Sequence, residues 1–207
     1  MVLLAPMILA KTLGDEVLLG TVFACSGAGG LIGGIILTLW GGSKTRKVLL
    51  IMVGIAIEGI TTILFGLGTG VVMWAATGFT VAFSGPMIMG SSQAIWQSKV
   101  EPNRQGRVFA ARGVIAMAAG AVGIALAGPL ADWLFEPAMA PGGWLDGTFG
   151  WLAGTGPGAG MGLIMVFCGI ASLMTAIVAY GIPRIRNLET LVPDHEAADG
   201  QKSEGLD

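Results

Sequence analysis

Charged residues are scarce in this sequence. Asp, Glu, Lys and Arg make up 12% of the 207 residues, whereas 54% are apolar and the mean hydropathy is +0.78. A soluble domain carries about 25% charged residues, so most side chains here are not expected to meet water. The net charge of −2 also lacks the basic excess that nucleic-acid binding requires. The composition therefore predicts a protein whose main partner is the lipid bilayer, and no nucleic acid.

Residues that carry metal or acid–base chemistry are also few. The only histidine, His195, lies in the polar C-terminal stretch, and the two cysteines, Cys25 and Cys168, lie inside apolar runs. No nucleophile–base pair or metal-ligand cluster can be assembled at membrane depth from this set. The sequence also has no GxxxxGKS/T nucleotide loop. We therefore expect no enzyme activity, metal, cofactor or ATP-driven pump. A channel stays an alternative, because a recognisable selectivity filter is the only feature of a channel that this sequence lacks.

The apolar residues are gathered into five runs that are long enough to cross a membrane, which takes about 20 helical residues. These runs are 17–40, 48–68, 71–97, 108–131 and 159–182. They lack two-residue alternation, which favours helices over barrel strands. Residues 1–10 are apolar but half as long, and we interpret them as the end of a sixth span in a truncated sequence. The predicted fold class is all-α, a polytopic transmembrane helix bundle.

Lysine and arginine are distributed unequally between the two sides that alternating spans create. Ten of the eleven fall on one side: Lys44, Arg46, Lys47, Lys99, Arg104, Arg107, Arg112, Arg184, Arg186 and Lys202. Because basic loops stay on the cytoplasmic side, we expect this side and the C-terminus to be cytoplasmic in a cell membrane. Residues 183–207, acidic from Asn187 onward, are predicted to be a disordered cytoplasmic tail. The aromatic, proline-bearing segment 132–158 is predicted to be more than a plain loop: it faces outward and lies along the outer surface or is partly re-entrant.

Few polar side chains fall within the predicted spans. Glu58 stands ten residues from either end of the run 48–68, and a charge at the bilayer centre costs roughly 2.5–3.5 kcal/mol. We interpret it as a proton-coupling site or as a counter-charge for the substrate; an acid hydrogen-bonded to a neighbouring helix is the alternative. Arg112 is a candidate for a gating ion pair or for snorkelling to the cytoplasmic face. Gln93 and Gln97 share a helix face and are candidates for lining a cytoplasmic vestibule or for interhelical hydrogen bonds.

Small residues and prolines mark candidate packing and kink positions. The 35 glycines include pairs at four-residue spacing, which let helix backbones approach each other in lipid. Two prolines within the runs are expected to kink their helices. The positions that we assign to packing or kinks are Gly30, Gly34, Pro86, Gly123, Gly128 and Pro129. The pattern leaves open whether these seams are static or slide during transport.

Three stretches carry a family resemblance. They are 97–109 (QSKVEPNRQGRVF), 127–137 (AGPLADWLFEP) and 154–160 (GTGPGAG). They resemble the loops around the last two helices of major facilitator superfamily transporters, most closely the macrolide-efflux-like drug exporters. The loop 40–47 (WGGSKTRK) is similar to the superfamily's basic cytoplasmic loop, without its acidic residue. Lys44, Arg46 and Lys47, together with Arg104, Arg107 and Arg112, are thus candidates for cytoplasmic gating or topology.

The resemblance implies that the chain is the C-terminal half of a twelve-helix secondary transporter. It implies proton-coupled efflux of hydrophobic or amphiphilic compounds such as drugs or macrolides. The implied partners are a small-molecule substrate, protons, and either an N-terminal six-helix half or a second chain. One alternative is another cargo, as in a siderophore exporter or a metabolite importer. The other is a non-transporting membrane fragment or helper subunit.

Overall fold

The computed structural model describes residues 3–43 and 46–191, and all regular secondary structure in these residues is helical. The predicted all-α class is therefore confirmed. Five of the described helices are long and apolar enough to cross a membrane, as expected for a polytopic bundle. Lys44, His195 and Lys202 lie outside the described residues.

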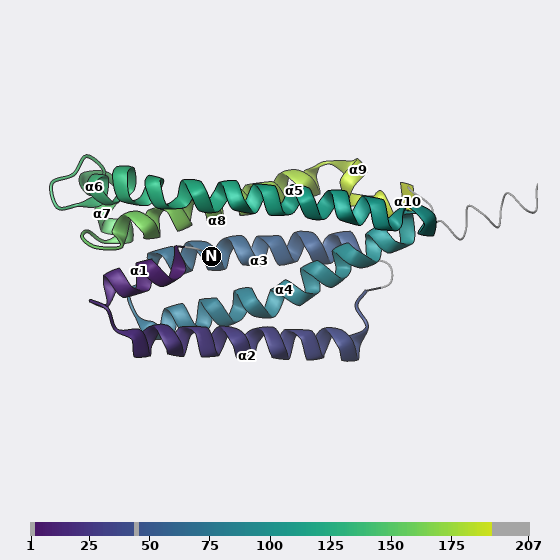
Figure 1. Cartoon of the computed structure of the whole chain (residues 1–207), viewed down its shortest axis with the longest axis horizontal. Helices are drawn as coiled ribbons and strands as arrows, with labels where there is room; N and C mark the ends of the chain where they lie inside the picture. The colour runs from purple at the N-terminus through teal and green to yellow at the C-terminus, as the bar shows by residue number, and fades with distance from the viewer. Residues whose placement is uncertain (1–2, 44–45, 192–207) are drawn as a thin grey trace, which may run out of the picture.

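The five long helices lie side by side along the long axis of the molecule (Figure 1). They are α2 (Glu16–Trp40), α3 (Lys47–Leu67), α4 (Val71–Lys99), α5 (Pro102–Pro129) and α8 (Ala159–Gly181). The helix α5 begins at Pro102 rather than at residue 108, because proline suits the first turn, where its missing N–H group would have no helical partner. Arg104 and Arg107 consequently lie on the first turns of α5 rather than in a loop.

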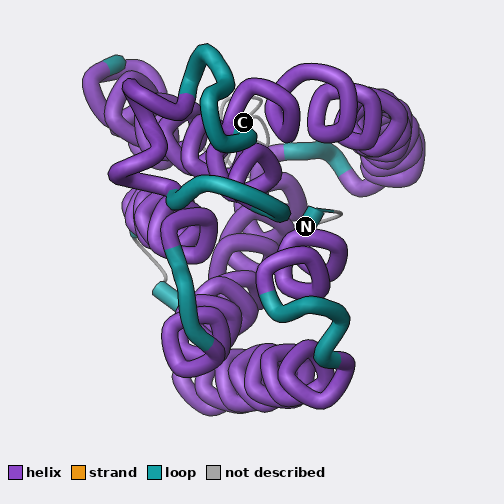
Figure 2. The backbone as a smooth tube through the Cα atoms, turned by 90° about the vertical axis from the view of Figure 1, so that its left-hand side faces the viewer, coloured by secondary structure: helices purple, strands orange, loops and turns teal. Residues whose placement is uncertain are grey.

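The long helices pack in a row, with α2 on α4, α4 on α3 and α3 on α8 (Figures 1 and 2). Glycines allow the close approach of α3 to α8. A Cβ atom on Gly59 would lie 2.9 Å from the carbonyl oxygen of Gly169, and one on Gly162 would lie 2.6 Å from that of Gly66. Two contacts between glycines, Gly59 with Gly169 and Gly66 with Gly162, therefore bring the two backbones together.

The α2–α4 interface uses other glycines than the predicted pair. Gly29 and Gly33 are buried directly against backbone carbonyl groups of α4. Gly30 makes only ordinary van der Waals contact with α4, and Gly34 has no atom of another helix within 4 Å. Both pairs have the same four-residue spacing, so the spacing identified a glycine seam on α2 without selecting the face that meets α4.

The short helix α1 (Leu4–Lys11) fills one end of the bundle. Its Met7 and Ile8 side chains are fully buried and pack with Val22, Phe65 and Trp74 in the main apolar core. Apolar burial is therefore concentrated at this end of the bundle, where α1 lies among α2, α3, α4 and α8.

The chain remains helical beyond α5, in the segment 132–158 that the sequence predicts to be more than a plain loop. A π-helix, η1 (Leu130–Phe135), continues from Pro129 into α6 (Glu136–Met139), and α7 (Asp146–Ala153) follows. Pro129 has no N–H group for the i→i−4 ladder, and the wider π turn takes over directly after it. The outer segment is thus a set of short helices joined by tight turns.

The chain after α8 differs from the expectation of disorder over 183–207. Two short helices, α9 (Pro183–Arg186) and α10 (Leu188–Leu191), follow α8 and return toward the start of α3. The remainder of the predicted tail, 192–207, lies outside the described residues.

Candidate functional site

An apolar cavity of about 160 Å³ lies inside the bundle and is lined by α1, α2, α3, α4 and α8. Its lining residues are Leu4, Phe23, Ser26, Thr62, Phe65, Gly78, Val81, Ala82 and Met165. Ser26 and Thr62 supply the only hydroxyl groups of this lining, and the Ser26 Oγ atom donates to the Val22 carbonyl oxygen at 2.9 Å. A wall of this kind suits an apolar molecule that carries a few polar groups.

Glu58 lies on α3 one helical turn before Thr62, so the two side chains share a face of the helix. The same face carries Gly54, which packs directly against Ile88 of α4. Glu58 is partly buried, and its backbone carbonyl accepts from Thr61 Oγ1 at 3.2 Å. Its carboxylate makes no hydrogen bond or ion pair with the described part of the chain. The structure thus places, one turn from the cavity wall, a carboxyl group that has no partner among residues 3–43 and 46–191.

Arg112 reaches across from α5 to α4 instead of extending toward the end of its own helix. Its Nη2 atom donates to Ser92 Oγ at 2.8 Å, and its Cζ atom lies 5.4 Å from the centre of the Trp96 ring. This geometry combines a charge-assisted hydrogen bond with a cation–π contact. The residue therefore forms a bridge between α4 and α5. It makes no ion pair with the described acidic residues.

Gln93 and Gln97 lie on the same half of α4, and both side chains are exposed. Over residues 3–43 and 46–191 neither side-chain amide forms a hydrogen bond to a neighbouring helix. The Gln97 backbone carbonyl accepts from Gln105 Nε2 at 3.1 Å, which ties the end of α4 to the start of α5. The two glutamines remain candidates for a solvent-facing vestibule.

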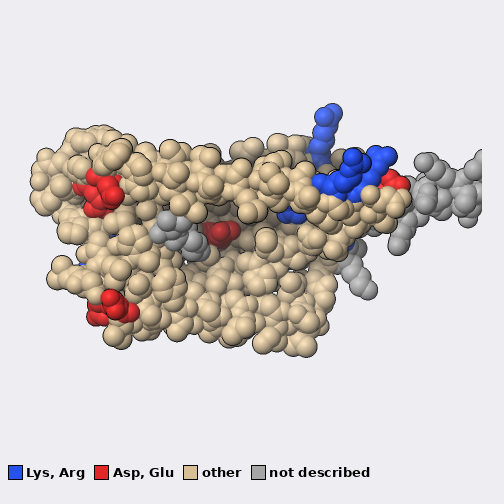
Figure 3. Space-filling view, viewed as in Figure 1, with Lys and Arg blue, Asp and Glu red and all other residues tan. Residues whose placement is uncertain are grey.

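The two ends of the bundle carry opposite charge (Figure 3). The basic end holds Arg46, Lys47, Lys99, Arg104 and Arg107, and the acidic end holds Asp15, Glu16, Asp132, Glu136 and Asp146. The basic end also contains Glu101, which pairs with Arg104 at 3.2 Å on the exposed surface. This division by sign matches the distribution that the sequence predicts.

At the basic end, Glu189 of α10 caps the first turn of α3. Its Oε1 atom accepts from the backbone N–H of Lys47 at 2.6 Å and from that of Val48 at 3.4 Å. Lys99 at the end of α4 donates from Nζ to the Glu189 carbonyl oxygen at 3.3 Å. An acid at a helix N-terminus satisfies free N–H groups and interacts favourably with the helix dipole. A residue in the segment that we expected to be disordered thus joins three elements.

At the acidic end, Lys11 and Glu136 cap two other helix termini. Lys11 Nζ donates to the carbonyl oxygens of Gly66 and Gly68 at 3.2 and 3.1 Å, at the C-terminus of α3. Glu136 accepts from the N–H groups of Gly158 and Met161 at 3.1 and 3.0 Å, at the start of α8. Burial lowers the pKa of Lys11, and the nearby Glu136 carboxylate opposes this shift. The only sign of the Lys11 cap in the sequence is that Lys11 is the one basic residue on an otherwise acidic side.

The helix α5 is the least covered of the five. None of its residues is buried, whereas each of the other four long helices has at least three buried residues. Gly123 and Gly128, which were predicted to pack, have no atom of another element within 4 Å. The apolar surface of α5 is therefore open to lipid or to another polypeptide.

Comparison with known proteins gives two related matches. Macrolide efflux protein A of Streptococcus pyogenes and the protein of the same name from its serotype M6 are each 34% identical to the chain over 107 residues. The aligned stretch is 51% of this chain and 26% of each relative, so the match spans about a quarter of the relatives' length. No family model and no solved structure matches the chain. The helices and this match confirm the resemblance seen in the sequence: the chain is a multi-pass membrane protein with homology to a macrolide efflux protein.

Proposed function

We propose that this chain forms the C-terminal half of a major-facilitator-type secondary transporter that exports hydrophobic or amphiphilic compounds, macrolides among them. The homology to a macrolide efflux protein supports the class of cargo and the direction of transport. The open surface of α5 supports a second helical bundle as the missing partner. Substrate would then bind between the two bundles near the middle of the membrane.

The observation that carries the proposal is the position of Glu58. Its carboxyl group lies mid-helix, one turn from the apolar cavity, without a partner among the described residues. An ionisable group inside a membrane span is costly and marks a proton or substrate pathway in many transporters. Here Glu58 would take up a proton from one side and release it to the other, and its change in charge would alter the affinity of the neighbouring cavity for substrate.

The orientation completes the proposal. The basic end would face the cytoplasm, because positively charged loops are retained on that side. The Arg112 bridge between α4 and α5 would then lie near the cytoplasmic entrance, and the termini capped by Lys11 and Glu136 would lie near the exit.

The test is energy-dependent efflux by the native protein. It would be expressed in macrolide-sensitive bacterial cells, and the release of a preloaded radiolabelled macrolide would be followed with and without a protonophore. We expect efflux above that of the empty vector, and we expect the protonophore to abolish it. The apparent mass of the native protein in membranes, detected with an antibody to residues 192–207, would be measured in parallel. Efflux equal to that of the vector, with the protein present in the membrane, would reject the proposal and favour a non-transporting helper.

A further inference from the structure

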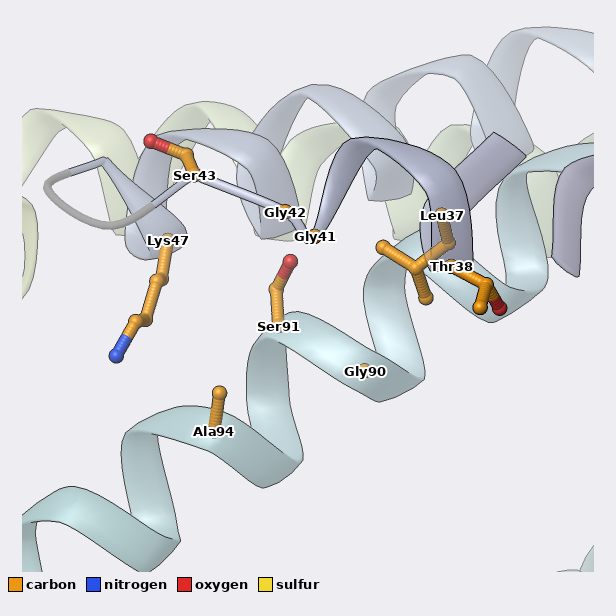
Figure 4. A pocket seen from close by; sticks show the side chains of 9 residues that line it. All are labelled: Leu37, Thr38, Gly41, Gly42, Ser43, Lys47, Gly90, Ser91 and Ala94. Atoms are coloured by element: carbon orange, nitrogen blue, oxygen red, sulfur yellow. The ribbon is translucent and has the colours of Figure 1, made fainter. Parts of the chain in front are cut away.

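A second and larger hollow lies at the basic end, between the end of α2, the chain that follows it and α4 (Figure 4). Its volume is about 440 Å³. The residues that line it are Leu37, Thr38, Gly41, Gly42, Ser43, Lys47, Gly90, Ser91 and Ala94. Lys47 is the one charged residue among them, so this lining carries positive charge and no carboxylate.

Ser91 places a hydroxyl group in this pocket that has no partner among the described residues. The residue is 5% exposed, and its hydroxyl points toward the turn at Gly41 (Figure 4). Unlike most serine and threonine hydroxyls of the described helices, it makes no hydrogen bond to the described part of the chain. Among the described residues, Trp74 Nε1 is the only fully buried side-chain nitrogen or oxygen atom without a partner, so solvent reaches the Ser91 Oγ atom, which is available to a ligand in the pocket.

Lys47 provides the charge for such a ligand. Its backbone N–H is engaged by Glu189, but its ammonium group forms no hydrogen bond or ion pair with the described residues. The side chain extends along the pocket toward α4 (Figure 4). Glu189 satisfies the α3 terminus and is not part of the pocket lining. An ammonium and a hydroxyl that both face one cavity match an anion with several acceptor oxygens.

Two exposed tryptophans lie at the same end of the bundle as the pocket. Trp40 ends α2 immediately before Gly41 and is 53% exposed, and Trp96 lies near the same end of α4 and is 39% exposed. Exposed tryptophans of membrane proteins gather at the headgroup level. Gly41 and Gly42, which line the pocket, adopt left-handed φ angles of 72°, which only glycine adopts readily.

We propose that this pocket binds a phosphate oxyanion, with Lys47 Nζ and Ser91 Oγ as its donors. The chemistry is that of a phospholipid headgroup phosphate or of free phosphate. Basic pockets between membrane helices bind anionic headgroups in this way. The site would tie a lipid to the junction of α2, α3 and α4, independently of any substrate.

The experiment is an equilibrium titration of the purified native protein in a neutral, phosphate-free detergent. One arm adds phosphatidylglycerol, a second adds inorganic phosphate and a third adds diacylglycerol, which lacks phosphate. We expect phosphatidylglycerol to bind. The Kd should rise about tenfold in Lys47→Gln, which loses a charge-assisted hydrogen bond, and about threefold in Ser91→Ala, which loses a neutral one. Lys47→Arg should retain binding. Arg184→Gln, which removes an exposed charge outside the pocket lining at the same end, is the matched control.

Each arm decides a separate point. Binding of inorganic phosphate as tight as that of the lipid, with the same sensitivity to Lys47→Gln, would support the site and assign free phosphate as its source. Binding of diacylglycerol as tight as that of phosphatidylglycerol would overturn the proposal, because phosphate would then be dispensable. Equal losses in Lys47→Gln and Arg184→Gln would also overturn it, since the effect would be one of general charge. Unchanged melting of each variant without lipid would show that it is folded.

Discussion

The carboxylate of Glu189 lies 2.6 Å from the backbone nitrogen of Lys47, and the two residues are 142 positions apart in the chain. The segment after the last long helix therefore closes the N-terminus of α3. At the other end of α3, Lys11 binds the last carbonyl groups. An acid at the N-terminus and a cation at the C-terminus both act favourably on the helix dipole. The central helix is thus held at its two ends by charged residues from distant elements.

Removal of the Glu189 cap should destabilise the start of α3. We expect Glu189→Ala to lower the free energy of unfolding by about 0.5–2 kcal/mol, the usual range for loss of an N-terminal cap. The measurement is thermal unfolding of the purified protein in detergent, followed by circular dichroism. Glu189→Gln is the control, since its amide oxygen can still accept both N–H groups, and its loss should be smaller. Equal melting temperatures for wild type and Glu189→Ala would show that the contact contributes nothing to stability.

Lys11 should make the stability of the protein depend on pH at the alkaline side. Lys11 ends α1, outside the five long helices, and burial lowers its pKa. Between this lowered pKa and the usual value of about 10.4, the unfolded chain binds more protons than the folded one. The free energy of unfolding should therefore rise with pH across this window. Lys11→Met should remove the rise, as measured by denaturant unfolding at several pH values.

The Glu136 carboxylate provides a second check on this prediction. It raises the pKa of Lys11 against the effect of burial. Glu136→Gln should therefore let the Lys11 pKa fall further and extend the pH-dependent window to lower pH. A stability profile that is the same in wild type and Lys11→Met would contradict the assignment of the pH dependence to Lys11.

Glu58→Gln should impair transport more than folding. The substitution keeps the shape of the side chain but removes the protonatable group, so we expect normal membrane insertion, strongly reduced macrolide efflux and a flattened dependence of efflux on pH. The measurement is efflux from cells held at several external pH values. Glu101→Gln is the control, because Glu101 is an acid on the exposed surface at the basic end. Unchanged efflux with an unchanged pH profile in Glu58→Gln would remove Glu58 from the coupling mechanism.

Gly66 should tolerate no side chain, since a Cβ atom there would collide with the backbone carbonyl of Gly162. We expect Gly66→Ala to destabilise the α3–α8 pair by about 1–3 kcal/mol, as overpacking does in other tightly packed interiors. Gly20→Ala is the matched control, because no atom lies within 4 Å of a Cβ at that position and alanine favours helix. Melting temperatures of the two variants in the same detergent decide the matter. A Gly66→Ala protein as stable as Gly20→Ala would mean that the helices separate at little cost.

The long helices and the charge difference between the two ends could be predicted from the sequence, because both depend on local composition. A run of about 20 apolar residues must bury its backbone polar groups in a helix wherever it lies in a bilayer. The extension of α5 back to Pro102 and its π-helical continuation after Pro129 were missed. A proline was visible in the sequence in both cases. Pro102 begins a helix and Pro129 is followed by a π-helix, and the sequence alone did not show that the chain stays helical on the far side of each.

Glu58 could be named as a candidate from the sequence alone, because a single carboxylate in the middle of an apolar run is conspicuous in any fold. The apolar cavity near Glu58 could not be predicted, since its wall combines side chains of five helices that only tertiary packing brings together. The same holds for the glycine seam of α2: the spacing marked two equivalent faces, and the approach of α4 selected Gly29 and Gly33. The helix caps by Glu189 and Lys11 join residues 142 and 55 positions apart. Local patterns thus determined which helices are long and apolar enough to cross a membrane and which end of the bundle carries which charge, whereas contacts between distant segments decided which polar groups of the described residues are paired.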